Sequence, residues 1–385
     1  MVKGKFPTGK LEALRTPFYY YDVELLNETL DLVKEQASKY DYLIHYAVKA
    51  NANPRLLSII AGRGIGADCV SGGEIEAAVN AGFHPSGIVF AGVGKADWEI
   101  ELGLRHNISC FNAESLPELE VIDSIAKEKH MTAPVALRIN PEVDAHTHAK
   151  ITTGMKENKF GINIGQLRQT LSGMDRMANV RLTGIHFHIG SQITDLSSFQ
   201  DLAIRVNEIQ DDLQGMGVLL ENINFGGGLG IDYHHPNHLP IAAFENYFAV
   251  INKLIKRRPG QRIHFEPGRS VVGQCGTLIA RALYVKEGET KRFAILDAGF
   301  TELIRPAMYD AYHRIENITG DGGEELYDVV GPICESSDVF ARGVRLNKVR
   351  RGDLLALRSA GAYGEVMASQ YNCRRLPASY FSDTV

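Results

Sequence analysis

A chain of 385 residues, 44% hydrophobic and 23% charged, is long enough for two globular domains and ordinary in composition. Its formal net charge of −5 gives no electrostatic reason to expect nucleic acid or a membrane surface as a partner. We find no apolar run of membrane-spanning length and no signal-peptide core. The five cysteines never form a C-x-x-C pair, which argues against a disulfide framework and structural zinc, so we expect a cytoplasmic enzyme.

A helix is expected after Asp22, and from there strands and helices alternate as far as Glu266. Pro54 is typical of a first helical position, and Ser71 and Ser115 each precede a glutamate by three residues, as in a capping box. Amphipathic helices are expected over residues 197–214 and 242–255. Eight segments have the pattern of buried strands: 42–48, 66–70, 87–91, 108–112, 134–140, 182–188, 222–225 and 262–266.

Eight alternating β/α units predict a closed parallel (β/α)8 barrel of the TIM type, with an open doubly wound sheet as the alternative. After Glu266 the pattern changes to strands and turns, with strands expected at 277–286, 292–296, 326–331 and 353–358. The N-terminal segment around residues 16–21 is also strand-like and can join that sheet. We therefore expect a barrel domain over residues 24–274 and a mainly β domain formed by residues 1–23 and 275–385.

Lys49 follows the first expected strand, and Asp68 lies at the end of the second. Barrel enzymes place their active sites at the carboxyl ends of the strands. Partial burial there disfavours the ammonium ion and favours the free amine, which is the form that condenses with an aldehyde. Taken alone, Lys49 has a simpler interpretation, as a lysine that only extends from a strand end to solvent.

Other polar residues follow later strands and are expected at the same rim. Three consecutive glycines, 226–228, and the hydroxyl of Ser191 are suited to donating to a phosphate group. His188 can stack on an aromatic ring, and Glu266 needs a partner such as a protonated ring nitrogen if it is buried. Singly, the glycines indicate a tight turn and His188 a core histidine. Together with Lys49, these residues predict a pyridoxal 5′-phosphate site.

The cluster His234-His235-Pro-Asn-His238 has the composition of a metal site but not the spacing of one. A proline interrupts it, and no helix or strand period places the imidazoles on one face. A solvated loop is the favoured interpretation, and we expect no metal site.

The sequence resembles the fold-type III pyridoxal-phosphate decarboxylases, and most closely the diaminopimelate decarboxylase family, from Phe18 to about Pro377. The resemblance implies an alanine-racemase-like fold, with a barrel and a β domain. The motifs that carry it are Tyr46-Ala-Val-Lys-Ala-Asn51, His186-Phe-His-Ile-Gly-Ser-Gln192, Gly226-Gly-Gly-Leu-Gly-Ile231, Glu266-Pro-Gly-Arg269, Asp297-Ala-Gly299, Arg305-Pro-Ala-Met-Tyr309, Gly331-Pro-Ile-Cys-Glu335 and Gly361-Ala-Tyr-Gly364.

The resemblance implies roles for individual residues of the barrel. Lys49 would be the Schiff-base lysine, and His188 would stack on the cofactor ring. Glu266 would pair with the pyridine nitrogen, and Asp68 would support the region around Lys49. The residues that would surround the cofactor phosphate are Ser191, Gly228, Gly268, Arg269 and Tyr363.

The resemblance also implies a homodimer with shared active sites, in which Cys334 and Glu335 serve the site of the neighbouring subunit. Cys334 or Lys49 would then protonate the carbanion left by decarboxylation, and the sequence does not decide between them. Two positions depart from the family pattern, Ser337 after the Cys-Glu-Ser motif and Glu302 before Leu-Ile-Arg-Pro, and neither removes a functional group. The residues implied in substrate recognition are Arg269, Arg305, Tyr309, Glu335 and Tyr363.

The implied activity is that of a carboxy-lyase, the conversion of meso-2,6-diaminopimelate to L-lysine and carbon dioxide, the last step of lysine biosynthesis. Related decarboxylases that act on ornithine, arginine or carboxynorspermidine are alternatives. Arg305 and Tyr309 favour a substrate with a carboxylate at each end, because a guanidinium takes a carboxylate in a bidentate pair. A fold-type III racemase is disfavoured by Glu266, since that family places arginine at the ring nitrogen. A non-catalytic pyridoxal-phosphate carrier is disfavoured by residues 277–385.

Overall fold

The computed structural model describes residues 6–143 and 159–385, which form two compact units. One comprises residues 30–230 and 243–268, and the other comprises residues 6–29, 231–242 and 269–385. The compact units differ from the expected domain limits at residues 24–29, 231–242 and 269–274, all of which pack with the β unit. The functional division into domains stays a prediction, and residues 1–5 of the expected β domain lie outside the described residues.

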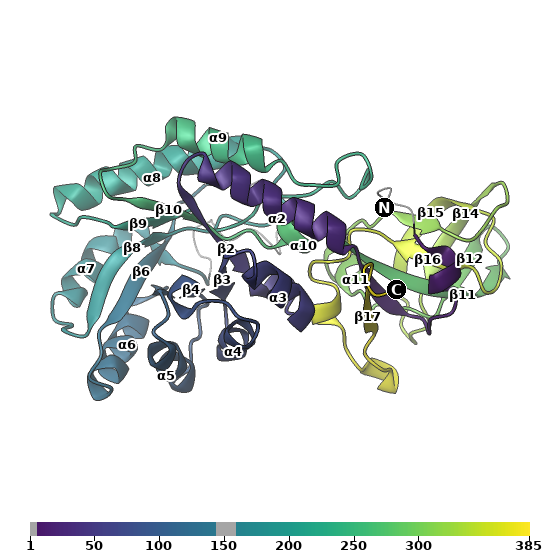
Figure 1. The fold of residues 1–385 in the computed structure, drawn as a ribbon, viewed down its shortest axis with the longest axis horizontal. Coiled ribbons are helices and arrows are strands. Elements are labelled where there is room, and N and C mark those ends of the chain that lie inside the picture. The colour runs from purple at the N-terminus through teal and green to yellow at the C-terminus, as the bar shows by residue number, and fades with distance from the viewer. Residues whose placement is uncertain (1–5, 144–158) are drawn as a thin grey trace. The chain divides into compact units, whose positions relative to one another are not determined.

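The first unit is a closed parallel barrel, as expected, and not an open sheet (Figure 1). Its strands pair in the order β2-β3-β4-β5-β6-β8-β9-β10, and β10 pairs with β2 to close the ring. A short outer strand, β7 (Ile162–Asn163), pairs with β6. The eight barrel strands are β2 (Tyr42–Ala47), β3 (Gly66–Cys69), β4 (Ile88–Phe90), β5 (Cys110–Ala113), β6 (Ala133–Asn140), β8 (Val180–His186), β9 (Asn222–Asn224) and β10 (Arg262–Phe265).

Helices connect the strands and lie outside the ring (Figure 1). Phe265 on β10 packs against Tyr247 and Phe248 of α9, with ring centroids 5.3 and 4.9 Å apart, so an aromatic layer fills the space between strand and helix. Long helices are expected where the sequence is amphipathic, and α8 and α9 confirm this. The helices from α2 to α9 are α2 (Val23–Ser38), α3 (Pro54–Ala61), α4 (Gly72–Asn80), α5 (Asp97–His106), α6 (Leu116–Glu128), α7 (Leu167–Met174), α8 (Ser197–Gly215) and α9 (Phe244–Leu254).

In each of the two expected capping boxes only one of the two reciprocal hydrogen bonds forms. Ser71 and Ser115 cap α4 and α6, because each hydroxyl accepts a hydrogen bond from the backbone N–H three residues on. The glutamates do not return to the cap residue, however. Glu74 accepts from the N–H of Val70, and Glu118 from that of Glu114, one residue further back in each case. The start of α3 at Pro54 is confirmed.

The second unit is a mainly β structure whose sheet follows the order β13-β16-β11-β12-β14-β15. The N-terminal strand β1 pairs with β11 and β17, so the expectation that this segment joins the sheet is confirmed. The short helices of the unit are α1 (Thr8–Leu11), α10 (Arg269–Val272) and α11 (Arg305–Tyr309). The strands are β1 (Phe18–Tyr21), β11 (Gly276–Glu287), β12 (Arg292–Leu296), β13 (Ile315–Asn317), β14 (Glu324–Val330), β15 (Val339–Asn347), β16 (Leu354–Leu357) and β17 (Ala378–Phe381).

Three of these strands were not expected from the sequence: β13, β15 and β17. The longest of them, β15, lies at the end of the strand order. Its apolar residues are interrupted by Arg342, Gly343 and Arg345, all of which are exposed. An exposed strand at the end of a sheet does not need a continuous apolar run, so its pattern resembles that of a loop.

Candidate active site

Lys49 lies in a single 3-10 turn, Val48–Ala50, directly after β2. Its Nζ is 3.7 Å from Oδ2 of Asp68, which lies on the neighbouring strand β3. The lysine side chain is 35% exposed and that of Asp68 only 1%, so a partly exposed amine lies beside a buried carboxyl group. In the described part of the chain neither oxygen of Asp68 accepts a hydrogen bond. Burial and the negative charge of Glu266 raise the pKa of Asp68 well above its ordinary value, although Lys49 opposes the shift.

Glu266 directly follows β10 and is buried with a partner on each carboxylate oxygen. Nε2 of His186, at the end of β8, lies 2.8 Å from Oε2, and Nδ2 of Asn224, at the end of β9, donates to Oε1 at 2.6 Å. Burial alone would raise the pKa of Glu266, but His186 and then Lys49 outweigh it and lower the pKa. The barrel therefore holds an ionised carboxylate at this end. His186 begins one of the sequence motifs and Asn224 lies in the expected strand 222–225, but we assigned no role to either.

His188 lies two residues beyond the end of β8, and its Nδ1 accepts a hydrogen bond from the N–H of Gly227 at 3.3 Å. Burial and the positive charges of Lys49 and Arg138 lower the pKa of His188 well below its ordinary value. The ring is therefore neutral at physiological pH. A neutral imidazole beside Lys49 can stack on an aromatic ring without adding a repelling positive charge.

The three consecutive glycines have a packing reason apart from any ligand. A Cβ at Gly226 would lie 2.1 Å from the carbonyl oxygen of Phe187, and one at Gly227 would lie 2.3 Å from that of Glu266. Gly228 has a φ of +117°, which residues with a side chain rarely adopt. These glycines let the chain after β9 pass between its neighbours, and their role toward a phosphate stays a prediction.

Two further predicted phosphate residues lie near the same rim. Ser191 is partly exposed on the loop after β8. Gly268 approaches the turn that carries Lys49, since a Cβ there would lie 3.0 Å from the Cβ atoms of both Ala47 and Ala50. A side chain at residue 268 would therefore press on the lysine turn.

A buried ion pair that the sequence reasoning missed lies across the same end of the barrel. Arg138 on β6 donates from Nη1 to Oε1 of Glu114 at 2.8 Å. The carboxylate also accepts from the N–H groups of Gly92 and Gly161. An arginine inside an expected strand next to a glutamate after the preceding strand is the sequence pattern that could have indicated it. Glu114 therefore links its own loop, after β5, to the loops that contain Gly92 and Gly161.

The predicted substrate-binding arginines meet in the second unit. Nη1 of Arg269 and Nη1 of Arg305 both donate to the hydroxyl oxygen of Tyr233, at 2.5 and 2.9 Å. The guanidinium of Arg269 also lies 4.9 Å from the ring centroid of Tyr363. Tyr363 has a φ of +56°, a strained backbone conformation of the kind that is often found at functional sites. Tyr309 lies one helical turn after Arg305 at the end of α11 and is partly exposed.

Cys334 and Glu335 lie on an exposed turn of the second unit. The N–H of Cys334 donates to Oδ1 of Asn372 at 3.5 Å, and Oε1 of Glu335 accepts from the hydroxyl of Tyr371 at 2.9 Å. The thiol is therefore open to solvent in the isolated chain. Glu302, one of the two departures from the family pattern, is buried and accepts from the N–H of Gly299.

The histidine cluster of residues 234–238 directly follows Tyr233 in the chain. His234, His235 and His238 are exposed, and the ring of His234 stacks on that of Tyr312 with centroids 4.2 Å apart. Over residues 6–143 and 159–385, no group of three or more His, Cys, Asp or Glu residues is placed to hold a metal ion. Of the helices that the structure describes, none combines the length and apolar character needed to cross a membrane.

The carboxyl end of the barrel fits pyridoxal 5′-phosphate. It offers an amine beside a buried acid whose oxygens accept no hydrogen bond in the described residues, a neutral imidazole, and an ionised carboxylate. This set defines a barrel-type pyridoxal-phosphate enzyme. Residues 24–273 match the family model described as the pyridoxal-dependent decarboxylase, pyridoxal binding domain.

Comparison with known proteins extends the match to the whole chain. Diaminopimelate decarboxylase of Bacteroides thetaiotaomicron is 60% identical over 99% of both chains. That of Helicobacter pylori strain J99 is 42% identical, over 94% of this chain and 89% of the relative. The crystal structure of the Helicobacter pylori enzyme complexed with L-lysine superposes with a TM-score of 0.92 at 39% identity, over 97% of this chain and 93% of that one. The chain belongs to the pyridoxal-dependent decarboxylases and, within them, to the diaminopimelate decarboxylase family, and its cofactor is pyridoxal 5′-phosphate.

Proposed function

We propose that the protein converts meso-2,6-diaminopimelate to L-lysine and carbon dioxide, as the last step of lysine biosynthesis. The observation that supports this most strongly is the 60% identity to a diaminopimelate decarboxylase along 99% of both chains. The buried guanidinium of Arg305 adds chemical support, because its hydrogen bonds within the described residues go to Tyr233 and His313 and to no carboxylate. A cation of this kind suits a substrate that keeps a second carboxylate away from the reacting carbon.

Bound pyridoxal phosphate supplies the electron sink that lets an amino acid lose carbon dioxide. In our proposal Lys49 holds the cofactor through its amine, and the carboxyl group of Asp68, 3.7 Å from Nζ, supports the region around Lys49. Glu266, fixed by His186 and Asn224, presents a negative charge that keeps a ring nitrogen protonated. His188 provides a neutral surface for stacking. Ser191, Gly228, Gly268, Arg269 and Tyr363 are proposed to surround the phosphate.

We assign the substrate contacts to residues of the second unit. Arg305 and Arg269 provide the positive charge for the distal carboxylate, and Tyr309 and Glu335 would bind the polar groups near it. A guanidinium offers two parallel N–H donors to a carboxylate, which an ornithine or arginine decarboxylase has no need for. Carboxynorspermidine carries one carboxylate fewer than diaminopimelate, so the same reasoning disfavours it.

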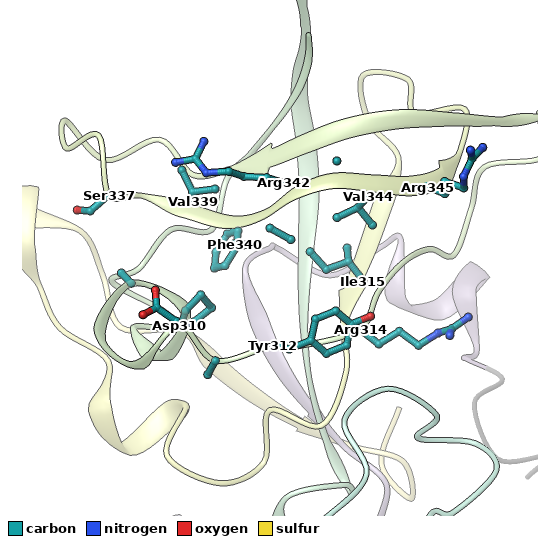
Figure 2. Close-up of a pocket in the computed structure, with 15 residues that line it drawn as sticks. Asp310, Tyr312, Arg314, Ile315, Ser337, Val339, Phe340, Arg342, Val344 and Arg345 are labelled. Carbon is teal, nitrogen blue, oxygen red and sulfur yellow. The ribbon is translucent and has the colours of Figure 1, made fainter. Parts of the chain in front are cut away.

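We further propose a homodimer in which Cys334 of one copy serves the site of the other. The exposed position of Cys334 and Glu335 supports this, because a residue that touches substrate is expected to be enclosed. The chain just after them, including Ser337 and Phe340, lines an open groove of about 710 Å³ on the second unit (Figure 2). A second copy seated over this region would cover both the turn and the groove.

The bond between the carboxylate and the α-carbon breaks in the reaction, and a proton must then be added to that carbon. Sγ of Cys334 and Nζ of Lys49 are the candidate donors. We also propose a cytoplasmic location, where the five free thiols would stay reduced.

The function is tested by measuring carbon dioxide release from a panel of diaminopimelate, carboxynorspermidine, ornithine, arginine and lysine. Each amino acid is incubated with the purified protein and pyridoxal phosphate. We expect turnover with diaminopimelate and much slower release from the others. Faster release from ornithine or carboxynorspermidine would assign the protein to a different decarboxylase. Racemisation without release of carbon dioxide would identify a racemase.

A further inference from the structure

The hydroxyl oxygen of Tyr233 joins two buried guanidiniums. It accepts from Nη1 of Arg269 at 2.5 Å and from Nη1 of Arg305 at 2.9 Å. The guanidinium carbons lie 5.9 and 5.2 Å from the centroid of the same tyrosine ring. Tyr233 is 7% exposed and both arginines are 6% exposed. All three residues belong to the same compact unit, although Tyr233 comes from the short segment 231–242.

The hydrogen bonds to the Tyr233 hydroxyl oxygen indicate whether the phenol is neutral or ionised. Two N–H donors occupy the lone pairs, and among the described residues the Tyr233 hydroxyl donates to no acceptor. A neutral phenol would therefore leave its own proton without a partner in a buried site between two cations, which is costly. Burial alone would raise the pKa of Tyr233, but the two guanidiniums outweigh it and lower the pKa.

His313, which faces Arg305, supplies no negative charge. Nε2 of His313 lies 3.0 Å from Nη1 of Arg305, and Nδ1 of His313 lies 2.9 Å from the carbonyl oxygen of Arg358. His313 must therefore donate from Nδ1 and accept at Nε2, which is the neutral form. Burial and the charge of Arg305 lower the pKa of His313 to about 3. Arg358 has its own partner, because its Nη1 donates to Glu316 at 2.9 Å.

We propose that Tyr233 is a phenolate in the folded enzyme and acts as a positioning residue that presents Arg305 to the distal carboxylate of the substrate. This proposal rests on the proposed function for the identity of that carboxylate. The phenolate offsets part of the positive charge of the two adjacent buried guanidiniums.

The hydrogen bonds of Arg305 also set its orientation. Both bonds that the described residues make to its guanidinium use Nη1, which donates to Tyr233 and to His313. The edge formed by Nε and Nη2 makes no hydrogen bond to another described residue. This edge is the one that takes a carboxylate side-on, with two parallel hydrogen bonds. Tyr233 and His313 therefore hold the back of the guanidinium and leave its binding edge for a ligand.

The charge of Tyr233 can be measured in the holoenzyme by carbon-13 NMR with label at the Cζ atoms of its tyrosines, of which the sequence has 15. We expect one resonance at the phenolate position at neutral pH in the wild type, and its loss in Tyr233→Phe. The matched control is Tyr247→Phe, which removes another buried hydroxyl that has no hydrogen-bond partner in the described residues and whose pKa burial raises. That variant should keep the phenolate resonance.

The positioning role is tested by kinetics and binding. We expect Tyr233→Phe to raise KM for diaminopimelate by about 10-fold to 100-fold, the effect of losing a charge-assisted hydrogen bond, with a smaller change in kcat. Binding of L-lysine, which keeps a carboxylate, should weaken similarly, and binding of 1,5-diaminopentane, which has none, should not. Tyr247→Phe should leave all three values unchanged.

A wild-type spectrum with every tyrosine at the neutral position would overturn the proposal, and this measurement does not depend on any variant folding. Equal weakening of L-lysine and 1,5-diaminopentane in Tyr233→Phe would overturn the positioning role, because loss of general structure affects both ligands. If the wild type does not turn over diaminopimelate, the proposed function fails, while the spectrum still decides whether Tyr233 is a phenolate.

Discussion

Oε2 of Glu266 lies 2.8 Å from Nε2 of His186, and both side chains are buried at the carboxyl end of the barrel. The strands that carry them are not neighbours, since β9 lies between β8 and β10. Asn224 on β9 completes the arrangement by donating to Oε1. Three adjacent strands thus fix one carboxylate before any ligand binds. The pKa of Glu266 is lowered and that of Asp68 is raised, which gives two matched predictions.

The first prediction concerns Glu266→Gln in the protein freed of cofactor. The pKa of Glu266 is lowered from its ordinary 4.5, so its contribution to the free energy of unfolding is complete above that value and is lost as pH falls through the lowered pKa. We expect the variant to be less stable by about 1–3 kcal/mol at neutral pH, with a difference that shrinks in acid. Urea unfolding at several pH values measures this. A difference that grows as pH falls would contradict an ionised Glu266.

The second prediction is the opposite trend for Asp68→Asn. Burial raises the pKa of Asp68 above its ordinary 3.8, so the folded wild type loses stability as pH rises from that value toward the raised pKa. The neutral amide does not titrate. We expect the variant to gain on the order of 1–3 kcal/mol relative to wild type as pH increases, and to lose activity. If the free energy of unfolding depends on pH equally in both proteins, then folding does not raise the pKa of Asp68.

The strand-end residues of the barrel were largely predictable from the sequence. The period of the apolar residues gives eight strands, and parallel strands in a barrel present their carboxyl ends at one rim. Lys49, Asp68 and Glu266 could therefore be placed near one another without coordinates. The partners of Glu266 could not, because they depend on the register between β8, β9 and β10, which a strand pattern does not contain.

The contacts and strands of the second unit were less predictable from the sequence. Tyr233 reaches Arg269 and Arg305 from a loop, and contacts of loop residues leave no periodic pattern in the sequence. Strand β15 was missed because its exposed residues are charged. The roles of Arg305 and Cys334 came from the resemblance and not from the pattern, and they stay predictions.

The third prediction is that Lys49→Ala abolishes turnover and removes the visible absorbance of the covalently bound cofactor. Lys95, in the loop after β4, also lies beside an acid, but its amine is buried and already donates to Glu118 and to the carbonyl oxygens of Gly92 and Asn112. The control is Lys129→Ala, which removes a surface lysine whose Nζ lies 3.1 Å from Glu101 and should keep both activity and absorbance. Full activity of the Lys49 variant would exclude this lysine as the cofactor anchor.

The fourth prediction concerns Arg305→Leu. Removing the guanidinium leaves the distal carboxylate of the substrate without a charged partner, and we expect weaker binding of diaminopimelate by roughly 10-fold to 100-fold. Cofactor affinity should be unchanged. Steady-state kinetics and titration with pyridoxal phosphate measure the two effects separately. Loss of cofactor affinity with unchanged substrate affinity would place Arg305 at the phosphate instead.

The fifth prediction concerns sharing of the active site between two copies of the chain. If Cys334 serves the site built around Lys49 of the other copy, then neither a Lys49→Ala homodimer nor a Cys334→Ala homodimer should turn over normally. A heterodimer of the two variants carries both lesions in one site and none in the other. Random exchange of subunits should therefore restore about a quarter of the wild-type sites, and activity should rise on mixing.

Subunit exchange must be shown independently, for example by mass spectrometry of isotope-labelled and unlabelled chains. The matched control is a mixture of Lys49→Ala with Cys373→Ala, since Cys373 is also exposed but is not proposed to touch substrate. In that mixture the Cys373 variant should be fully active alone and mixing should add nothing. If exchange occurs and the Lys49 and Cys334 mixture stays at the average of its parts, then Cys334 acts within its own chain, because only a site assembled from two copies can be repaired by exchange.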